Sequence, residues 1–409
     1  MRGTELLDKM GLISPGYIAE AEKKSEKLLR RRKLRRVRLG VGSAACICAA
    51  VFGAYAAARF GTANPDTQNT NLEKINIPQL VTGMGFEGYL CRDISELENG
   101  NPWSEEMNIT SLPVYKNLAF DETRVGFKLG LDEVEMTEML FCTMESLGLS
   151  AETSSIEVSR DACTLVDGKM TPLDNATAVR AVTDKKGEKL TVYADGMTEY
   201  FLPDNTFLPS GYSFTRTEED DAEAEKALGY LVDEYADFLG ISEPALSAHT
   251  LGRGVDGVVN RKYTVYDAAG DDEDLILNYN FAKTTFSPNS SGCLRIIRKE
   301  NALSAAEKLG DYPLVTADEA KKRLADGCYQ TSVPLEFPGE DKIAKYELVY
   351  RVSAFEEVLL PYYRFYVLLP DSLNRIGSEI GLKLYGAYYV PAIEEEYIEN
   401  MPLWDGSFD

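Results

Sequence analysis

His249 is the only histidine in the sequence, so it limits the kinds of catalytic and metal site that the chain can build. Zinc sites of the usual His and Cys type need several such ligands at short spacing, and neither C-x-x-C nor H-E-x-x-H occurs. A Ser-His-Asp or Cys-His site would have to use His249, yet the motifs G-x-S-x-G and S-x-x-K are both absent. We therefore interpret His249 as a residue of a loop or of a strand edge, and we predict no catalytic residue, no metal site and no cofactor.

Carboxylates are abundant, and their hard oxygen atoms are the ligands that Ca²⁺ prefers. The run Asp271 to Asp274 lacks the ordered spacing and the central glycine of an EF-hand, so we expect it to form the solvated tip of a hairpin. We expect Glu394 to Glu396 to be solvated as well. A pair of carboxyl groups placed for glycoside hydrolysis stays open as an alternative, because folding rather than sequence spacing sets the distance between them.

Aromatic residues are concentrated near the C-terminus, where they would suit either a carbohydrate or peptide groove or the half-buried positions of strands. The structural interpretation is favoured, because tyrosine is common in strands with its hydroxyl group at the surface. These residues are Tyr362, Tyr363, Phe365, Tyr366, Tyr385, Tyr388, Tyr389 and Trp404.

Helices and short strands must position these residues. The helical period of apolar residues predicts a helix over 132–147 that ends at Gly148, with a methionine stripe that we expect in the core rather than in a binding groove. A second helix is expected over 219–239, capped by Thr217 and ended by Gly240. Turn signals separate short strands that we expect over 155–158, 178–182, 189–193, 198–202, 262–266, 275–281 and 294–298.

A third helix begins at the capping box formed by Thr316 and Glu319, and strands are expected after it over 346–352, 362–369 and 382–390. A helix followed by antiparallel strands thus occurs three times, which favours α+β domains with helices packed on one face of an antiparallel sheet. The fold class is therefore α+β, with an N-terminal transmembrane helix followed by two or three extracytoplasmic domains. The expected parts are a cytoplasmic helical arm over 1–38, a transmembrane helix over 39–60, a mobile linker over 61–79 and α+β units over 80–210, 211–300 and 301–409.

The membrane prediction rests on residues 39–58, which contain no charged side chain. At about 1.5 Å per residue a helix of that length crosses the hydrocarbon of a bilayer. The cationic residues are concentrated before it, with Arg59 alone directly after it, and the more cationic flank stays cytoplasmic. We therefore predict a single-pass anchor with residues 61–409 outside the cell. The residues that set this orientation are Arg30, Arg31, Arg32, Lys33, Arg35, Arg36 and Arg38.

This segment has three weaker interpretations: a cleaved signal peptide, a lipoprotein signal, and a buried helix of a soluble protein, which the seven cations before it disfavour. Ala54-Tyr55-Ala56 has the small-x-small pattern of a signal-peptide cleavage site, although the charged region before it is long for a signal peptide. A lipoprotein signal ending at Cys46 is disfavoured, because Ser43 stands where a large aliphatic residue is expected.

Charge is divided unevenly along the chain. Residues 1–59 carry 13 Lys and Arg and 5 Asp and Glu, a formal charge of +8. Because the whole chain carries −23, residues 60–409 carry −31. A part this acidic does not hold nucleic acid by counterion release, so nucleic acid is excluded as a partner.

Five cysteines lie beyond the predicted anchor, and their odd number and wide spacing are unlike a disulfide-stapled secreted module. We expect mostly buried thiols, with at most one disulfide bridge. These residues are Cys91, Cys142, Cys163, Cys293 and Cys328.

The inner arm is expected to form short helices with Leu6, Leu7, Met10 and Ile18 along their apolar side. Because some thirty residues are too few to bury a core of their own, this side needs a protein partner or the inner face of the membrane. The sequence TELLDKMGLISPGYIAEAEKK, followed by arginines and the predicted anchor, resembles the cytoplasmic N-terminal segment of single-pass Gram-positive surface proteins. Some of those proteins are anti-sigma-like regulators. The resemblance implies a sigma factor or a sensor kinase as a cytoplasmic partner.

Two further resemblances concern the outer part. GMGFEGY, NPW around Trp103 and LPVYKN resemble a segment of uncharacterised clostridial surface proteins, and we expect strand and loop there with Trp103 as a packing anchor. DYPLVTADEAKKRL, KYELVYRV and LLPYYRFYV look like YycH/YycI-type regulators and related PepSY-like or cystatin-like modules. This last resemblance implies a helix packed on a short sheet.

Together these observations indicate a membrane-anchored, non-enzymatic regulatory protein that binds an envelope ligand or restrains a partner. A cell-wall hydrolase that uses paired carboxylates and a structural envelope component are the alternatives.

The predicted topology has a direct test. Protease added to intact cells should remove residues 61–409 while a cytoplasmic control protein stays whole, because only the outer part is exposed to the medium. Survival of the outer part, or a mature chain free in the culture fluid and beginning near Ala57, would contradict the anchor.

Overall fold

The computed structural model describes residues 72–78, 97, 99–214, 221–253, 259–331, 333–373 and 381–406. All of them belong to one compact unit, Gln68–Asp409. The predicted inner arm with Leu6, Leu7, Met10 and Ile18, the cationic run from Arg30 to Arg38 and the predicted anchor all lie outside the described residues. Within the described residues, no helix has both the length and the apolar character needed to cross a bilayer.

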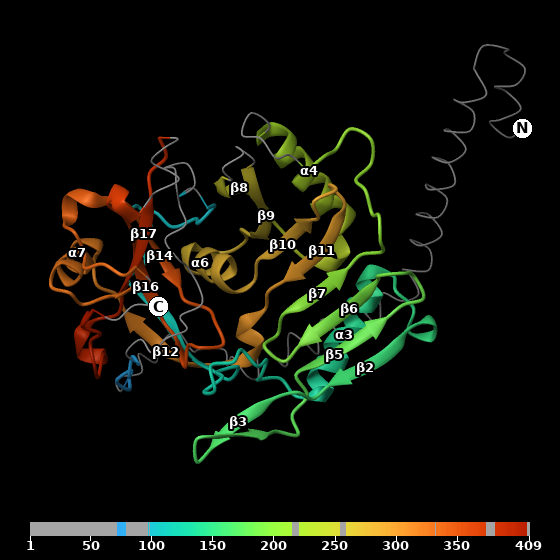
Figure 1. The fold of residues 1–409 in the computed structure, drawn as a ribbon, viewed down its shortest axis with the longest axis horizontal. Helices are drawn as coiled ribbons and strands as arrows, with labels where there is room; N and C mark the ends of the chain where they lie inside the picture. The colour runs from blue at the N-terminus through green and yellow to red at the C-terminus, as the bar shows by residue number, and fades with distance from the viewer. Residues whose placement is uncertain are drawn as a thin grey trace, which may run out of the picture. The chain divides into compact units, whose positions relative to one another are not determined.

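The described part is α+β, with antiparallel sheets and few helices, as the sequence predicts (Figure 1). Its helices are α3 (Glu133–Leu147), α4 (Asp221–Glu234), α5 (Ala236–Leu239), α6 (Asp272–Phe281) and α7 (Ala317–Ala325). Its strands are β1 (Ser111–Asn117), β2 (Ser155–Ser159), β3 (Cys163–Val166), β4 (Lys169–Pro172), β5 (Ala178–Val182), β6 (Lys189–Tyr193), β7 (Thr198–Phe201), β8 (Pro244–Arg253), β9 (Val259–Asp267), β10 (Thr284–Pro288), β11 (Leu294–Lys299), β12 (Ala306–Pro313), β13 (Gln330–Thr331), β14 (Ile343–Tyr350), β15 (Val358–Leu359), β16 (Pro361–Leu368) and β17 (Tyr385–Pro391). They form an eight-stranded sheet in the order β2-β5-β6-β7-β11-β10-β9-β8, a four-stranded sheet in the order β13-β17-β16-β14, a three-stranded sheet in the order β12-β1-β15, and the hairpin β3-β4.

Side-chain alternation gives the eight-stranded sheet one apolar face and one polar face. Residues that pair across neighbouring strands form rows that contain one residue from each of the eight strands. One such row is wholly apolar or aromatic, and the next row, whose side chains point to the opposite face, is wholly polar. The apolar row is Ala248, Tyr263, Phe286, Ile297, Tyr200, Leu190, Ala181 and Ile156. The polar row is Ser247, Thr264, Thr285, Arg298, Glu199, Thr191, Arg180 and Glu157.

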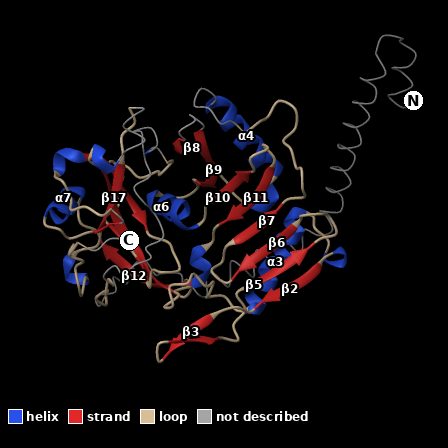
Figure 2. Ribbon diagram, viewed as in Figure 1, coloured by secondary structure: helices blue, strands red, loops and turns tan. Residues whose placement is uncertain are grey.

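Helices α3 and α4 cover the apolar face (Figure 2). Met136, Leu140 and Met144 of α3 are buried against the sheet, which confirms that the methionine stripe belongs to the core. Leu228 and Leu231 of α4 join the same core. The capping box of α3 at Asp132 and its end at Gly148 match the predicted bounds.

The helix predicted over 219–239 is divided into two. α4 ends at Glu234, and α5 begins after Tyr235, whose φ of −105° and ψ of 20° interrupt the helix. Lys299 on β11 donates to the carbonyl oxygens of Phe238 (3.1 Å) and Leu239 (2.8 Å). These bonds satisfy carbonyl groups at the C-terminal end of α5, where a cation is favoured by the helix dipole.

Helix α7 packs on one face of the four-stranded sheet through Ala320 and Leu324, and its predicted capping box at Thr316 and Glu319 is present. The tyrosines and phenylalanine of the predicted aromatic set are all at most 8% exposed. They belong to strands, as the structural interpretation has it, but they are fully buried and not half-buried as predicted. Trp103 lies with its ring centroid 6.0 Å from that of Tyr346 and 5.9 Å from that of Tyr363, which confirms it as a packing residue.

One predicted strand is wrong. Residues 275–281 belong to helix α6, because Asp271 and Asp274 cap each other's backbone N–H groups across its first turn, instead of forming a hairpin tip. The run alternates apolar and polar residues only in part, and the buried Ile276 and Asn280 are four residues apart, as on one side of a helix. Helix α6 contacts both β9 and β14, so it joins the two large sheets (Figure 1).

Strands from different α+β units expected from the sequence pair with one another in the same sheets. Strand β7 from 80–210 pairs with β11 from 211–300, and β1 pairs with β12 from 301–409. Within the range expected to be a mobile linker, Ile75 and Ile77 are 4% and 1% exposed. Ile75 bridges to Ile398 in parallel, so residues 72–78 are extended but packed.

Gly130 offers a test of this packing. Its φ is +119°, and a Cβ atom there would lie 2.8 Å from both the carbonyl oxygen of Ala194 and the Cβ of Ala305. We expect Gly130→Ala to lower the free energy of unfolding by about 3 kcal/mol, since both the backbone strain and the overlap must be relieved. Gly148→Ala, at φ +67° with open space around it, should cost only about 1 kcal/mol by denaturant titration. Equal losses would contradict the close approach at Gly130.

Candidate functional site

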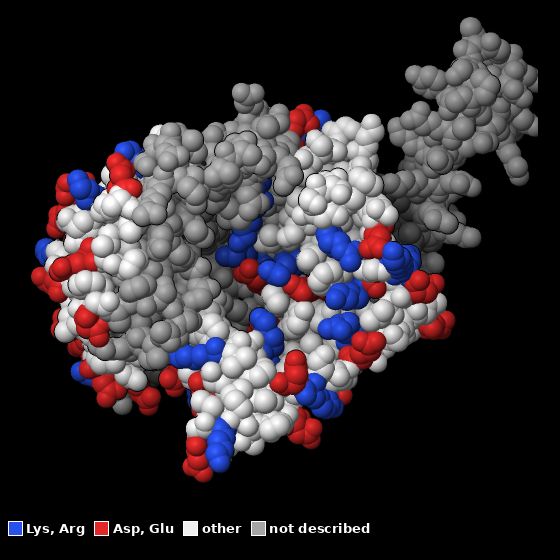
Figure 3. All heavy atoms as spheres, viewed as in Figure 1, with Lys and Arg blue, Asp and Glu red and all other residues white. Residues whose placement is uncertain are grey.

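A cavity of about 470 Å³ is lined by residues of the polar face of the eight-stranded sheet, of helix α6 and of the four-stranded sheet. In Figure 3, Lys and Arg side chains gather around a hollow in this face of the molecule. Two carboxylates line the cavity, Asp195 and Glu300, against six cationic side chains. The cations are Lys128, Lys262, Lys283, Arg298, Arg351 and Arg364.

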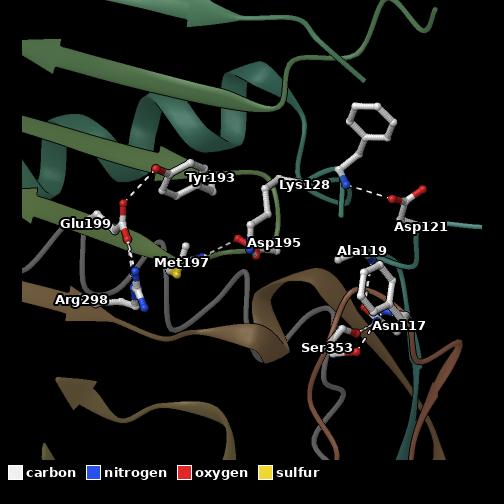
Figure 4. Close-up of polar contacts among 12 residues, drawn as sticks. Asn117, Ala119, Asp121, Lys128, Tyr193, Asp195, Met197, Glu199, Arg298 and Ser353 are labelled. Carbon is white, nitrogen blue, oxygen red and sulfur yellow. Dashed lines mark hydrogen bonds and ion pairs between the residues drawn. The ribbon is translucent and has the colours of Figure 1, made fainter. Parts of the chain in front are cut away.

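The polar row of the eight-stranded sheet fixes Arg298. Its Nε and Nη2 donate to Glu199 Oε1 at 2.9 and 2.6 Å, and Tyr193 donates to Glu199 Oε2 at 2.9 Å (Figure 4). Burial and the bond to Glu199 raise the pKa of Tyr193 to about 12, so the phenol stays a donor. A guanidinium held on a buried carboxylate keeps a fixed orientation at the cavity wall.

A tight loop carries Lys128 to the same cavity, where it pairs with Asp195 (Figure 4). Asp121 organises this loop, because its carboxylate accepts from the backbone N–H groups of Thr123, Gly126 and Phe127 at 2.7–3.0 Å. Burial alone would raise the pKa of Asp121, but the hydrogen bonds that it accepts outweigh burial and lower that pKa below its ordinary value.

Asn117 ties the end of β1 to the loop that follows β14. Its Nδ2 donates to the carbonyl oxygens of Ser353 (3.0 Å) and Glu356 (2.7 Å), and its Oδ1 accepts from Ala119 N at 2.9 Å. The amide thus satisfies three backbone groups at once. Because Asn117, Ala119 and Ser353 all line the cavity, these bonds fix the relative position of two segments of its lining.

The four-stranded sheet supplies two buried arginines. Arg364 donates through Nε to Glu347 Oε1 at 2.9 Å, and Lys345 lies 3.1 Å from Glu347 Oε2. Burial opposes the ionisation of Glu347, which is 1% exposed, but Arg364 and Lys345 outweigh it and lower its pKa. Asn99 also donates to Glu347 Oε1 at 2.9 Å.

Arg351 is held by Glu356 and by the side-chain oxygen of Gln330. Its guanidinium lies 5.3 Å from the ring centroid of Tyr362 and 5.6 Å from that of Tyr389, within cation–π range. Tyr362 and Tyr389 therefore support the guanidinium of Arg351.

His249 lies on β8, at the edge of the eight-stranded sheet, which confirms the prediction of a strand-edge residue. It also lines the cavity, and its Nδ1 is 3.0 Å from Ser247 Oγ. Burial is the main cause that lowers the pKa of His249 to about 4, and Lys262, Lys283 and Lys345 add to it. The ring is therefore neutral near pH 7 and lies in a positive field.

Thr264 contributes a polar group that the protein leaves unsatisfied. It lines the cavity, is 3% exposed, and its Oγ1 has no hydrogen-bond partner among the described residues. A buried hydroxyl group without a partner costs free energy, so such groups call for an explanation. Lys262, two residues earlier on β9, shares the face of Thr264.

The groups around His249 can be compared with those of a catalytic triad and of a metal site. Ser247 and His249 are within hydrogen-bond distance of each other, but no carboxylate of the described residues is hydrogen-bonded to the ring to orient it as a base. In the described part of the chain, no group of three or more His, Cys, Asp or Glu side chains is placed to hold a metal ion. Of the described cysteines beyond the predicted anchor, Cys293 is buried whereas Cys142, Cys163 and Cys328 are partly exposed, so the expectation of mostly buried thiols is wrong for them. Cys91 is outside the described residues.

Of the residues singled out in the sequence, the fold brings His249, Tyr366 and Tyr389 to the cavity. The six cations were not foreseen. The sequence does contain a pattern for one of them. Lys262 and Thr264 alternate with the apolar Tyr263 and Val265, which indicates a strand with one polar face. That pattern gives the face of each residue but not the partners across the cavity.

Comparison of the chain with protein-family models and with curated proteins finds no match. Functional conclusions therefore rest on the geometry of the cavity.

The environment of His249 predicts a pH effect on stability. Its pKa is lowered on folding, so its contribution is fully present above the ordinary pKa of 6.5 and is lost as pH falls toward about 4. Between about pH 7 and about pH 5 the wild-type free energy of unfolding should fall by about 2 kcal/mol more than that of His249→Gln. Equal pH slopes in urea titrations of the two proteins would contradict the buried, neutral ring.

Proposed function

We propose that the chain is a single-pass membrane protein that binds a small extracytoplasmic ligand in the cavity and performs no chemistry on it. The observation that carries this proposal is the cavity of about 470 Å³, which lies within the size range of small-molecule sites. Its walls come from segments as far apart in sequence as Asn99 and Tyr389. A ligand bound there would contact both large sheets and helix α6, so its binding energy would act on their relative position.

The membrane part of the proposal rests on the uncharged segment 39–58 and on the cationic residues before it. Residues 1–38 then face the cytoplasm, and the apolar side formed by Leu6, Leu7, Met10 and Ile18 would contact a regulatory protein such as a sigma factor or a sensor kinase. The resemblances to anti-sigma-like and YycH/YycI-type regulators agree with this role. A bound ligand would be reported inward through the anchor.

The hydrolase alternative is not favoured by the cavity. Glycoside hydrolysis needs two carboxyl groups that face one substrate bond, one of them protonated. The two carboxylates of the cavity instead each face a lysine, Asp195 on Lys128 and Glu300 at 3.9 Å from Lys283. A purely structural role in the envelope would not require a ligand-sized cavity.

Filling the cavity tests the proposal. Ala354, which lines it, can be replaced by tryptophan, and Ala151→Trp on the exposed turn before β2 serves as the matched control. The detergent-solubilised full chain, incubated with the small-molecule fraction of a cell extract, should retain a non-covalent adduct in native mass spectra. We expect Ala354→Trp to reduce this adduct by about tenfold or more, since the indole occupies the ligand volume, and Ala151→Trp to leave it unchanged. No adduct in any protein, equal adducts in all three, or a chemically altered adduct would contradict the proposal.

A further inference from the structure

Cationic side chains outnumber carboxylates among the residues that line the cavity, whereas the chain as a whole is acidic. Glu199, Glu347 and Glu356, which pair with the three arginines, are not among the lining residues. Residues 60–409 carry a formal charge of −31, yet six cations and only two carboxylates line the cavity. Low-dielectric walls lined by one sign of charge focus the field and raise the local concentration of ions of opposite sign. A cationic ligand would be disfavoured in the cavity, although it would be attracted to most of the remaining surface.

The cations differ in how they are held. The three arginines are hydrogen-bonded to the buried or half-buried carboxylates of Glu199, Glu347 and Glu356, which places them as fixed parts of the wall. Lys283 has a looser arrangement, at 3.9 Å from Glu300 and 5.0 Å from the ring centroid of Tyr279. An ammonium group at such distances can move toward a ligand without breaking a short hydrogen bond.

Three features converge on one corner of the cavity. Lys262 and Thr264 are on the same face of β9, and His249 is opposite Lys262 on β8. Lys262 and Lys283 line the same cavity as His249, and with Lys345 they help burial to lower its pKa, while Glu347 acts against them. The unsatisfied Oγ1 of Thr264 adds a buried hydroxyl group that is ready to donate.

We infer that the ligand of this cavity carries an oxyanion, a phosphate or carboxylate group, received by Lys283, Lys262, Thr264 and His249. This inference rests on the proposed ligand-binding function and specifies its ligand class. The oxyanion would accept from the ammonium groups and from the Thr264 hydroxyl group, which has no acceptor among the described residues. The remaining volume, bordered by Tyr366, Tyr389 and Leu359, would hold an organic part of the same molecule.

Three probes that share a phenyl ring and differ in the attached group test the ligand class: phenyl phosphate, benzoate and phenol. Each is titrated at constant ionic strength against the detergent-solubilised full chain, with the thermal unfolding midpoint as the readout. We expect at least one anion to raise the midpoint while phenol leaves it unchanged, and the preferred anion identifies the oxyanion as phosphate or carboxylate. Equal effects of phenol and the anions, or no effect of any probe, would overturn the inference.

Two variants separate a ligand role from a structural one. Lys283→Gln and Thr264→Val should each weaken binding of the preferred anion by about tenfold, because each removes a donor to a charged acceptor. Thr264→Val should also leave the ligand-free protein as stable as the wild type or more so, since the hydroxyl group that it removes has no partner. Lys226→Gln, on the exposed side of α4, is the control and should bind like the wild type. Unchanged affinity in both cavity variants would overturn the inference.

The outcomes also distinguish this inference from the proposed function. If the cell extract yields an adduct that Ala354→Trp abolishes, but no anion stabilises the chain, the cavity binds a ligand of another class. If neither experiment shows binding, both conclusions fall.

Discussion

Consecutive side chains of a strand point to opposite faces of a sheet, and helices α3 and α4 cover only one face of the eight-stranded sheet. This constraint sorts the residues of all eight strands. Tyr263 and Ile297 pack under the helices, while their neighbours Thr264 and Arg298 are left on the opposite face. An antiparallel sheet tolerates such a division, because one face can remain polar. The cationic side of the cavity follows from this division.

A polar face becomes a site only where something else closes it, and helix α6 provides that closure. Its Ile276 and Phe281 pack in the core of the four-stranded sheet, and Asn280 Oδ1 accepts from the backbone N–H of Tyr350 at 2.9 Å. The helix thus joins the two sheets through both apolar packing and a buried hydrogen bond. Its C-terminal end carries Tyr279 and Asn280 to the cavity, and Lys283 follows directly after it.

Burying arginines between two sheets is costly unless each has a partner, and the structure meets this requirement with carboxylates and aromatic rings. Glu347 binds Arg364, faces Lys345 and accepts from Asn99, so one buried carboxylate fixes three neighbours. Arg351 lies over Tyr362 and Tyr389. The acidic residues of the chain therefore have two roles, since most keep the surface negative while a few hold the cations of the cavity in place.

The sequence by itself determined the local structure wherever a pattern was complete within one segment. Strands 178–182 and 189–193, the cap at Thr316, and the buried methionine stripe all follow from residue order, because propensity, capping and periodicity act over a few neighbouring residues. The prediction of a strand over 275–281 was wrong because a short apolar run fits either the helical or the strand period. The reciprocal cap of Asp271 and Asp274, together with packing between two sheets, stabilises the helix instead.

Only the tertiary structure determines which strands are neighbours, and the cavity depends on that arrangement. The pairing of β7 with β11 and the meeting of Lys128, Arg298 and Arg364 depend on contacts between residues far apart in the chain, which no local pattern encodes.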